Sequence, residues 1–391
     1  MLTAASGKVS HEVRTFATTT AGLQALAAWL ESFGVTHVAM ESTGIFWRPV
    51  FNLLEGRFQV ILVNAQHMKA VPGHKTDIRD SEWLADLLRH GLLKASFIPP
   101  KPIRDLRDLV RSRKTLVRQR AQAINRVQKV LETANIKLSS VATDVLGKSG
   151  RDMIEALLAG ISDAEALADL ARRRLRAKLP ALREALDGRV EATHRLLLRH
   201  LLDLIDFLQG KLDTLADEID QLLAPYERLL TRLMQIPGIG RLAAATILAE
   251  IGTDMSRFPS AKHLASWAGV APGNKQSGGK RLRASTTKGH THLRAVLAEV
   301  VWVISHTKEN YLSAQYHRLA RRMGEKRAIV AVSHSLLTII YQMLRTDQDY
   351  HDLGPHFFQT LDTTRQRDTA VRRLEALGYK VMLEEKTEVL A

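Results

Sequence analysis

The sequence predicts an α/β domain up to Ile98, followed by a basic and mainly helical region. Short apolar runs typical of buried strands alternate with amphipathic runs typical of helices through Ile98. Pro99-Pro100-Lys101-Pro102 then interrupts the chain, and beyond it apolar residues recur at helical spacing among many Lys and Arg. Because strands separated by helices pair most readily in parallel, we expect a largely parallel sheet in the first domain.

Composition narrows the class of protein further. A chain of 391 residues is long enough for two or three domains with cores of their own. The formal net charge of +15 indicates a polyanionic partner, because Lys and Arg displace counterions from phosphates. The sequence has no cysteine, which excludes disulfides and thiolate metal sites and favours a cytoplasmic protein.

Membrane association is not expected. The N-terminus lacks a signal-like apolar segment behind positive charges, and we find no lipidation motif. The apolar stretch from Ala328 to Leu344 includes several polar residues and is shorter than the roughly 20 residues of a membrane span. We therefore predict a core helix there.

The elements of the first domain follow from local patterns. In order, we predict a strand at Val13–Phe16, a helix at Thr20–Phe33, a strand at Val35–Met40, a helical segment around Phe51–Leu54 and a strand at Val60–Val63. A sheet of this kind normally opens with one more strand, yet the chain starts at Met1 and has no Asp before Asp77. We expect the opening hairpin to be absent.

Three acidic residues are candidates for a metal site. Asp77 and Asp80 are three apart at the predicted start of a helix, so their carboxylates share one face. Glu41 follows the predicted strand Val35–Met40, and active sites of α/β domains lie at such strand ends. Asp77 also suits the N-cap of a helix, so both interpretations stay open.

The segment from Lys101 to Ala134 carries ten basic and three acidic residues. A solvated helix face normally mixes both signs, so this excess favours a nucleic-acid-binding helix. Few aromatic residues interrupt it, which favours phosphate contacts over base stacking. The candidate residues are Arg111, Arg113, Lys114, Arg118, Arg120 and Arg126.

A heptad pattern follows a stretch of short predicted helices. It consists of Leu201, Ile205, Leu208, Leu212, Leu215, Ile219 and Leu222. Three repeats do not distinguish a seam between subunits from an antiparallel pair within one chain. Further on, Gly238 and Gly240 precede a helical run that starts at Leu242. They suit either a helix-hairpin-helix element that grips a phosphate backbone or a tight turn that needs glycine.

No acidic residue occurs between Met255 and Ala298. This segment contains a Gly-rich loop in which Ser277 precedes Gly278-Gly279. A serine among cations can attack a phosphodiester while the cations stabilise its oxygens, although such a sequence is often a plain loop. The cations proposed to bind nucleic acid here are Lys275, Lys280, Arg281 and Arg283.

Three separated segments together resemble a known family. Met40-Glu41-Ser42-Thr43-Gly44, Lys75-Thr76-Asp77-Ile78-Arg79-Asp80 and the loop Ala268 to Gly278 resemble the DEDD-type serine transposases of bacterial insertion sequences. These recombinases are guided by a structured bridge RNA. The resemblance implies a RuvC-like domain of ribonuclease H fold over residues 1–98, a basic helical and coiled-coil region over 99–232 and a mainly α transposase domain over 233–391.

The resemblance also implies a mechanism. Glu41, Asp77 and Asp80 match the second, third and fourth acids of a Mg²⁺ site, and Ser277 matches the nucleophile that forms a phosphoserine link to DNA. The first family acid has no counterpart in this sequence. The implied partners are DNA, a structured guide RNA and further copies of the chain, as a dimer or tetramer whose composite site joins acids and serine of different subunits.

Two alternatives remain at this point. One is a nuclease similar to Holliday junction resolvases, in which water attacks and Ser277 is a bystander. The other is a truncated, non-catalytic protein that only binds nucleic acid, which the missing first acid favours.

Overall fold

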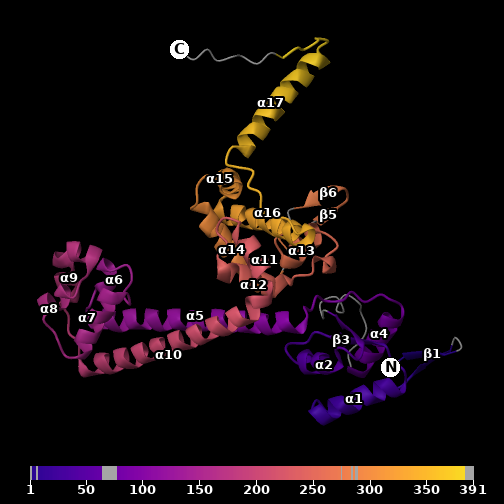
Figure 1. The fold of residues 1–391 in the computed structure, drawn as a ribbon, viewed down its shortest axis with the longest axis horizontal. Helices are drawn as coiled ribbons and strands as arrows, with labels where there is room; N and C mark the ends of the chain where they lie inside the picture. Colours follow the sequence, from indigo (N-terminus) through magenta and orange to yellow (C-terminus); the bar gives the residue numbers. More distant parts are fainter. Residues whose placement is uncertain are drawn as a thin grey trace. The chain divides into compact units, whose positions relative to one another are not determined.

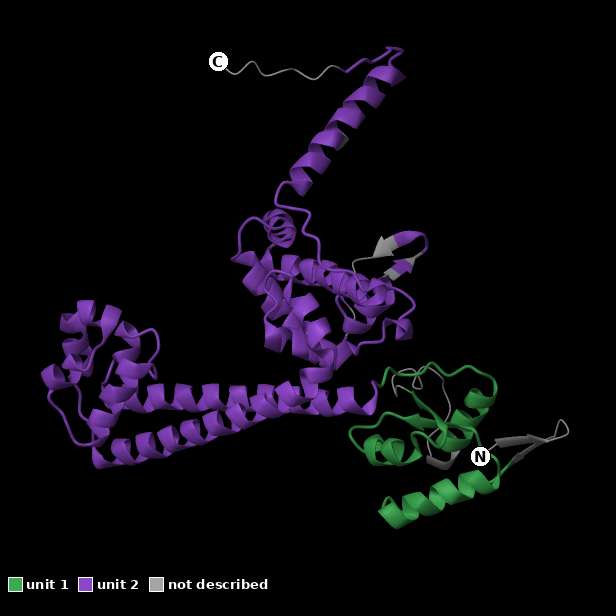
Figure 2. Ribbon diagram, in the orientation of Figure 1, with its two compact units in different colours: residues 1–98 green, residues 99–391 purple. Residues whose placement is uncertain are grey.

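The computed structural model describes residues 2–5, 8–63, 77–273, 275–282, 285–286 and 289–383. Within these ranges, the side chains of residues 2–5, 8–10, 77–79, 275, 277, 281–282 and 365 lie outside the description. The chain divides into two compact units, residues 1–98 and 99–391, which meet at the proline-rich break (Figure 2). The division of the second unit at residue 232 stays a prediction.

The first unit contains a short parallel sheet with helices packed beside it. Strand β3 (His37–Glu41) pairs with β4 (Gln59–Val63), and α2 (Trp47–Leu54) connects them, so the predicted alternation is confirmed here. Helix α1 (Thr20–Ser32) begins where Thr19 accepts a hydrogen bond from the Gly22 amide at 3.2 Å. A core of Ala27, Leu30, Leu54 and Phe58 joins α1 to this sheet.

The predicted strand at Val13–Phe16 was wrong. Strands β1 (Leu2–Ala5) and β2 (Lys8–His11) form an antiparallel hairpin, whereas residues 13–16 form no strand. The ring of Phe16 packs on Trp29 of α1 with centroids 5.4 Å apart, so its apolar character reflects a helix contact.

The hairpin β1–β2 is a separate sheet from β3–β4. Helix α4 (Asp77–Arg89) packs against both β1 and β3. In the described residues the parallel sheet has only two strands, so the ribonuclease H fold remains a prediction for this unit.

The second unit begins with two long helices that lie side by side in opposite directions (Figure 1). They are α5 (Lys101–Thr133) and α10 (Ala192–Leu223). Pro102 lies in the first turn of α5. Backbone amides of a first turn have no acceptor within the helix, so the missing amide hydrogen of proline costs no hydrogen bond there. The far end of the pair shares a core with four short helices, α6 (Leu138–Val141), α7 (Lys148–Leu158), α8 (Ala164–Asp169) and α9 (Leu179–Leu186).

The predicted heptad seam lies inside this antiparallel pair. Ile205, Leu208, Leu212 and Ile219 are buried, and the other three seam positions are half-buried. Because α10 packs extensively along α5, the seam closes within one chain. The buried seam residues are therefore used inside the chain, which favours the antiparallel pair over a seam between subunits.

The C-terminal part is a cluster of helices around α16. Its elements are α11 (Glu227–Met234), α12 (Arg241–Ile251), α13 (Ala261–Ala268), β5 (Lys275–Ser277), β6 (Lys280–Leu282), α14 (Thr291–Ser305), α15 (Tyr311–Met323), α16 (Glu325–Thr346) and α17 (Phe357–Ala376). Helix α16 is long and apolar enough to cross a membrane. It packs against α13, α14 and α15 and fully buries Val332, Leu336 and Leu337, as expected of a core helix.

Candidate functional site

The three candidate metal ligands belong to the first unit. Glu41 is the exposed last residue of β3 and lies opposite Val63 at the carboxyl end of the parallel pair. Asp77 is the first residue of α4, and its side chain lies outside the description. Asp80, half-buried, is in the first turn of the same helix, which packs against β3.

The described side chains do not by themselves complete a metal site. Among them, no group of three His, Asp or Glu side chains gathers around one point. The structure therefore brings the elements that carry Glu41 and Asp80 into contact, and the convergence of all three carboxylates stays a prediction.

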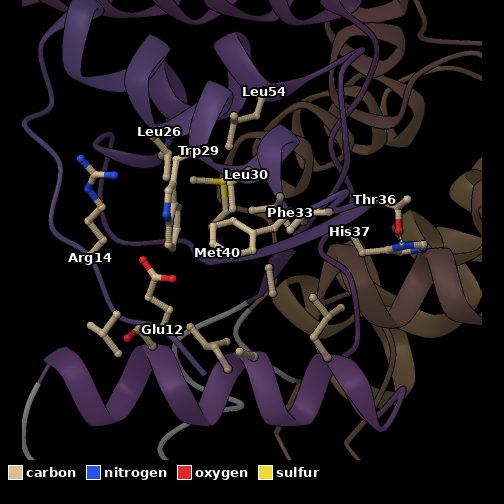
Figure 3. A pocket seen from close by; sticks show the side chains of 18 of the residues that line it. Glu12, Arg14, Leu26, Trp29, Leu30, Phe33, Thr36, His37, Met40 and Leu54 are labelled. Carbon is tan, nitrogen blue, oxygen red and sulfur yellow. Dashed lines mark hydrogen bonds between the residues drawn. The ribbon is translucent and has the colours of Figure 1, made fainter. Parts of the chain in front are cut away.

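A hollow of about 730 Å³ lies in the first unit, lined by residues of α1, β3 and α4 (Figure 3). Its walls include Trp29, Leu30 and Met40, with the charged Glu12 and Arg14 also on its lining. Such mainly apolar walls suit apolar side chains better than a metal ion or a phosphate. We therefore keep the metal hypothesis at the carboxyl end of β3.

Ser277 lies in the second unit, at the end of a tight hairpin. It is the last residue of β5 and pairs with Lys280, the first residue of β6. Gly278 and Gly279 have φ values of 53° and 76°, and a two-residue turn with positive φ at both positions favours glycine. The predicted flexible loop is therefore a defined β-hairpin with the serine next to its turn.

The side chains around Ser277 are only partly described. Lys280 is exposed. The side chains of Lys275, Ser277 and Arg281 lie outside the description, and Arg283 lies outside the described residues altogether. Their predicted contacts with nucleic acid therefore stay predictions.

The two ends of this hairpin segment pair with each other, and Gly289, which follows the segment, lies close against the end of α13. The amide of Gly273 donates to the carbonyl of Ser285 at 3.2 Å, and Pro272 forms an isolated bridge with Thr286. At Gly289, a Cβ atom would stand 2.2 Å from the amide nitrogen of Gly269, which directly follows α13. A larger residue at position 289 would clash with the backbone at the end of α13.

A buried charge cluster lies close to the point where the chain returns from the hairpin. Glu250 of α12, 0% exposed, receives two hydrogen bonds from Arg111 of α5, of 2.9 and 2.8 Å. Arg107 lies 3.3 Å from the same carboxylate and also donates to the carbonyls of Ala249 and Glu250. His290 caps α14 by accepting from the Leu293 amide, and its Nε2 is 3.4 Å from the Glu250 carboxylate.

The electrostatics of this cluster follow from its burial. Burial alone would raise the pKa of the Glu250 carboxyl, but the hydrogen bonds from Arg111 and the positive charge of Arg107 lower it overall. Burial, helped by the charges of Arg111 and Arg107, lowers the pKa of His290 to about 4. His290 is therefore neutral at pH 7, which suits a ring whose Nδ1 accepts from the Leu293 amide.

We expect stability to fall in mild acid because of His290. Its pKa is about 6.5 in the unfolded chain and about 4 in the folded one, so between these values the unfolded state binds the extra proton. The contribution is complete above pH 6.5 and is lost as pH falls toward 4, amounting to about 3 kcal/mol at most. Denaturant unfolding at pH 7.5, 6.5, 5.5 and 5 measures the slope.

The matched variant for this prediction is His290→Asn, since asparagine still caps the helix. It lacks the titrating ring and should flatten the pH dependence between 6.5 and 5, while Glu250, His292, Arg107 and Arg111 remain. An equally steep fall in the variant would assign the effect to another group.

Some cations of the basic helix α5 pair with acidic residues, whereas others are exposed. Arg111 is committed to Glu250, and Lys114 pairs with Glu299 at 2.8 Å. Arg113 and Arg120 are half-buried, whereas Arg118 and Arg126 are exposed. Arg111 is thus bonded to an acid of its own chain, and its contact with phosphate stays a prediction, while Arg118 and Arg126 are exposed candidates on this helix.

The glycines before α12 also differ from one another. At Gly238, φ is 84° and a Cβ would lie 2.8 Å from the side chain of Ile304, so close packing on α14 requires glycine. Gly240 is the N-cap of α12, and a Cβ there would meet nothing within 4 Å. The tight-turn interpretation accounts for Gly238, while Gly240 leaves room for a phosphate.

Sequence reasoning missed Glu250 and His290. The signal for Glu250 was a single acid in the otherwise apolar helical run from Leu242 to Ile251. An acid in such a run is either exposed or paired, and periodicity alone does not say which.

Comparison with known proteins agrees with this division of the site. A family model described as "Transposase" matches residues 1–136, which contain the three acids. A second, described as "Transposase IS116/IS110/IS902 family", matches residues 230–317, which contain Ser277 and Glu250. Together they match more than half of the chain.

Curated relatives include recombination proteins from several bacteria. The chain is 35% identical over 121 residues to the pilin gene-inverting protein of Moraxella bovis, a match that spans 30% of this chain and only 37% of that protein. It is 25% identical over 296 residues to the transposase for insertion sequence element IS1111A of Coxiella burnetii, 74% of this chain and 72% of the relative.

A putative transposase of Sinorhizobium fredii is 25% identical over 335 residues, 83% of this chain and 77% of the relative. The two family matches, over residues 1–136 and 230–317, and the long relatives lead to the same result. The chain belongs to the IS116/IS110/IS902 family of transposases.

Proposed function

We propose that this chain is an insertion-sequence transposase that cuts and rejoins DNA strands through a covalent phosphoserine intermediate, with Mg²⁺ assistance and RNA guidance. It would act in the cytoplasm as a dimer or tetramer. The observation that carries the proposal is the placement of Ser277 directly before a Gly-Gly hairpin turn, in a segment matched by the family model.

The chemistry assigned to Ser277 balances without an energy source. Its Oγ would attack the phosphorus of a DNA phosphodiester and lose its proton to solvent or a nearby base, while the bond from phosphorus to the leaving sugar oxygen breaks. That oxygen takes up a proton as a free hydroxyl. The new phosphoserine ester has nearly the energy of the old bond, so a hydroxyl of another strand can reverse the step and rejoin the DNA.

Glu41, Asp77 and Asp80 form a donor set that fits Mg²⁺. All three are carboxylates, the ligands that hard cations prefer, and they lie on two elements of the first unit, β3 and α4, that pack against each other. When bound, the ion would supply positive charge for a phosphodiester oxygen. The role of the three acids is to hold that charge at the carboxyl end of β3.

The surface proposed to bind nucleic acid includes the exposed face of α5. We expect the charge reversals Arg118→Glu and Arg126→Glu together to weaken binding of duplex DNA at all sequences, because phosphate contacts carry no sequence information. The slope of log K against log salt should fall by about 2. Filter binding from 50 to 300 mM salt measures both effects.

Arg367→Glu on α17 is the control for this variant, since it also reverses an exposed arginine. It should leave the slope unchanged. Identical slopes in the wild-type chain and the α5 variant would remove this helix from the interface.

A direct test of the proposed function is the recovery of DNA linked covalently to the protein. The purified chain, with Mg²⁺ and the RNA that copurifies with it, is incubated with a pool of plasmids and denatured with detergent. Protein-linked DNA is then precipitated and sequenced. We expect linked DNA whose sequence is enriched at one junction.

Two other outcomes would contradict the proposal. Nicked or cut DNA without attached protein would indicate a nuclease in which water attacks. Binding with neither cutting nor attachment, under all metal and RNA conditions, would indicate a protein that only binds nucleic acid.

A further inference from the structure

A second strongly basic segment lies outside every element discussed so far. Residues 172–178 read Arg-Arg-Arg-Leu-Arg-Ala-Lys, with five cations in seven positions. They connect α8 to α9, and residues Arg173–Lys178 form a short 3-10 helix. All five cations are exposed.

Four of these five cations border a hollow instead of a flat surface. The hollow has a volume of about 610 Å³, and its polar and charged lining includes Lys148, Ser149, Arg172, Arg173, Arg174 and Lys178. Asp144 is the acidic residue of its lining among the described residues. The walls therefore carry a clear excess of positive charge.

The segment is held in place by bonds that leave its central cations available. The amide of Arg172 donates to Ser149 Oγ at 3.0 Å, and its guanidinium donates to Asp152 at 2.6 Å. Lys178 donates to the carbonyl of Val141 at 3.1 Å. Within the described part of the chain, Arg173 and Arg174 have no acidic partner.

The opposite wall is equally well fixed. At Gly150 in α7, a Cβ would lie 2.2 Å from the carbonyl oxygen of Val145, so the loop before α7 packs directly on the helix. Arg173 adopts a φ of 53°, a conformation that is unfavourable for a residue with a long side chain. Two unpaired arginines are thus presented on a rigid and locally strained backbone.

We infer that this hollow binds the phosphodiester backbone of a nucleic acid, as a second contact separate from α5 and the serine hairpin. A polyanion relieves the repulsion among cations that share one concave surface. Arginine forks bind phosphate oxygens in pairs. A membrane surface fits less well, since the cations are not accompanied by an exposed apolar helix face around the hollow.

The inference rests on the proposed function in one respect, that the natural ligand is the DNA or RNA which the transposase handles. Whether DNA or folded RNA supplies the phosphates is decided by the experiment. The test variant is Arg173→Asn with Arg174→Gln in the full chain, because asparagine tolerates positive φ and should preserve the loop. The matched control is Arg183→Gln with Arg199→Gln, which removes two charges from the same helical module at positions paired with Glu165 and Glu155.

Binding of duplex DNA and of a hairpin RNA is measured for each protein between 50 and 300 mM salt. In the test variant, we expect the magnitude of the slope of log K against log salt to fall by about 2 for one of the two ligands. In the control, we expect this slope to fall by less than half as much. The affected ligand identifies the source of the phosphates. Slopes equal to wild type for both ligands would overturn the inference while leaving the proposed function intact.

A chemical probe keeps the two hypotheses distinguishable. Tripolyphosphate should raise the melting temperature of the wild-type chain and of the control, but raise that of the test variant much less. If the wild-type chain binds neither DNA nor RNA, the proposed function fails, and this probe still tests the hollow. Equal shifts in all three proteins, or binding of anionic lipid vesicles alone, would overturn the inference.

Discussion

Replacing Ser277 by alanine is expected to abolish covalent protein–DNA adducts and to lower strand exchange on the order of 10⁶-fold, the effect of removing a covalent nucleophile. The change removes one oxygen and leaves the Gly278-Gly279 turn and its positive φ values untouched. The fold should persist, because the side chain precedes the turn at an edge of the two-stranded hairpin. Adducts are measured by detergent-resistant precipitation of labelled DNA.

The control for this variant is Ser285→Ala. Ser285 is exposed in the same segment, and it is its backbone carbonyl that accepts the bond from Gly273. We expect wild-type adduct levels in this protein. Adducts that persist in Ser277→Ala would assign the nucleophile to another group, and adducts absent from both variants would point to damage of the hairpin itself.

Replacing Glu250 by glutamine is expected to lower the free energy of unfolding by about 3–5 kcal/mol, the usual cost of removing one partner from a buried ion pair. Glutamine keeps the volume of the side chain but not its charge. Arg111 and Arg107, with side chains only 26% and 12% exposed, would then lose the carboxylate charge that Glu250 places beside them. Denaturant unfolding at pH 7.5 measures the loss.

Glu299→Gln is the matched control, because Glu299 also pairs with a cation of α5 but is 66% exposed. An exposed pair contributes about 0–1 kcal/mol, so this variant should unfold almost like wild type. Equal losses in the two variants would mean that the buried cluster does not stabilise the contact between α5 and α12. Because His290 joins the same cluster, Glu250→Gln should also loosen the segment that follows the hairpin.

Local sequence patterns predicted most helices well. The bounds of α1 and α5 were predicted nearly to the residue, from the apolar spacing of Thr20–Phe33 and from the Pro-rich start of the basic helix. Helix periodicity and capping are local properties, so the sequence is enough to place them. Positive φ at Gly278 and Gly279 is likewise what a Gly-Gly pair permits. The prediction of a strand at 13–16 was wrong because an aromatic residue such as Phe16 can pack on a helix as well as belong to a β-strand.

The partners of charged residues could not be predicted from the sequence. Arg111 and Arg118 stand on the same basic helix, yet one is bonded to an acid 139 positions away and the other is exposed. In the sequence, the run Arg172 to Lys178 is one basic stretch among several, whereas in the structure four of its five cations line one hollow. The spacing of charged residues along a sequence does not indicate which residues they will pair with in the folded chain.

By itself, the sequence determined the order of helices, the proline break between the two units, the acids and the serine proposed to act, and the family resemblance that comparison confirmed at the level of IS116/IS110/IS902 transposases. The tertiary structure alone decided that the heptad seam closes on α5 within one chain and that Glu250 neutralises two arginines. The physical reason is range: backbone preferences and apolar periodicity act over a few residues, whereas burial and ion pairing depend on which distant surfaces meet.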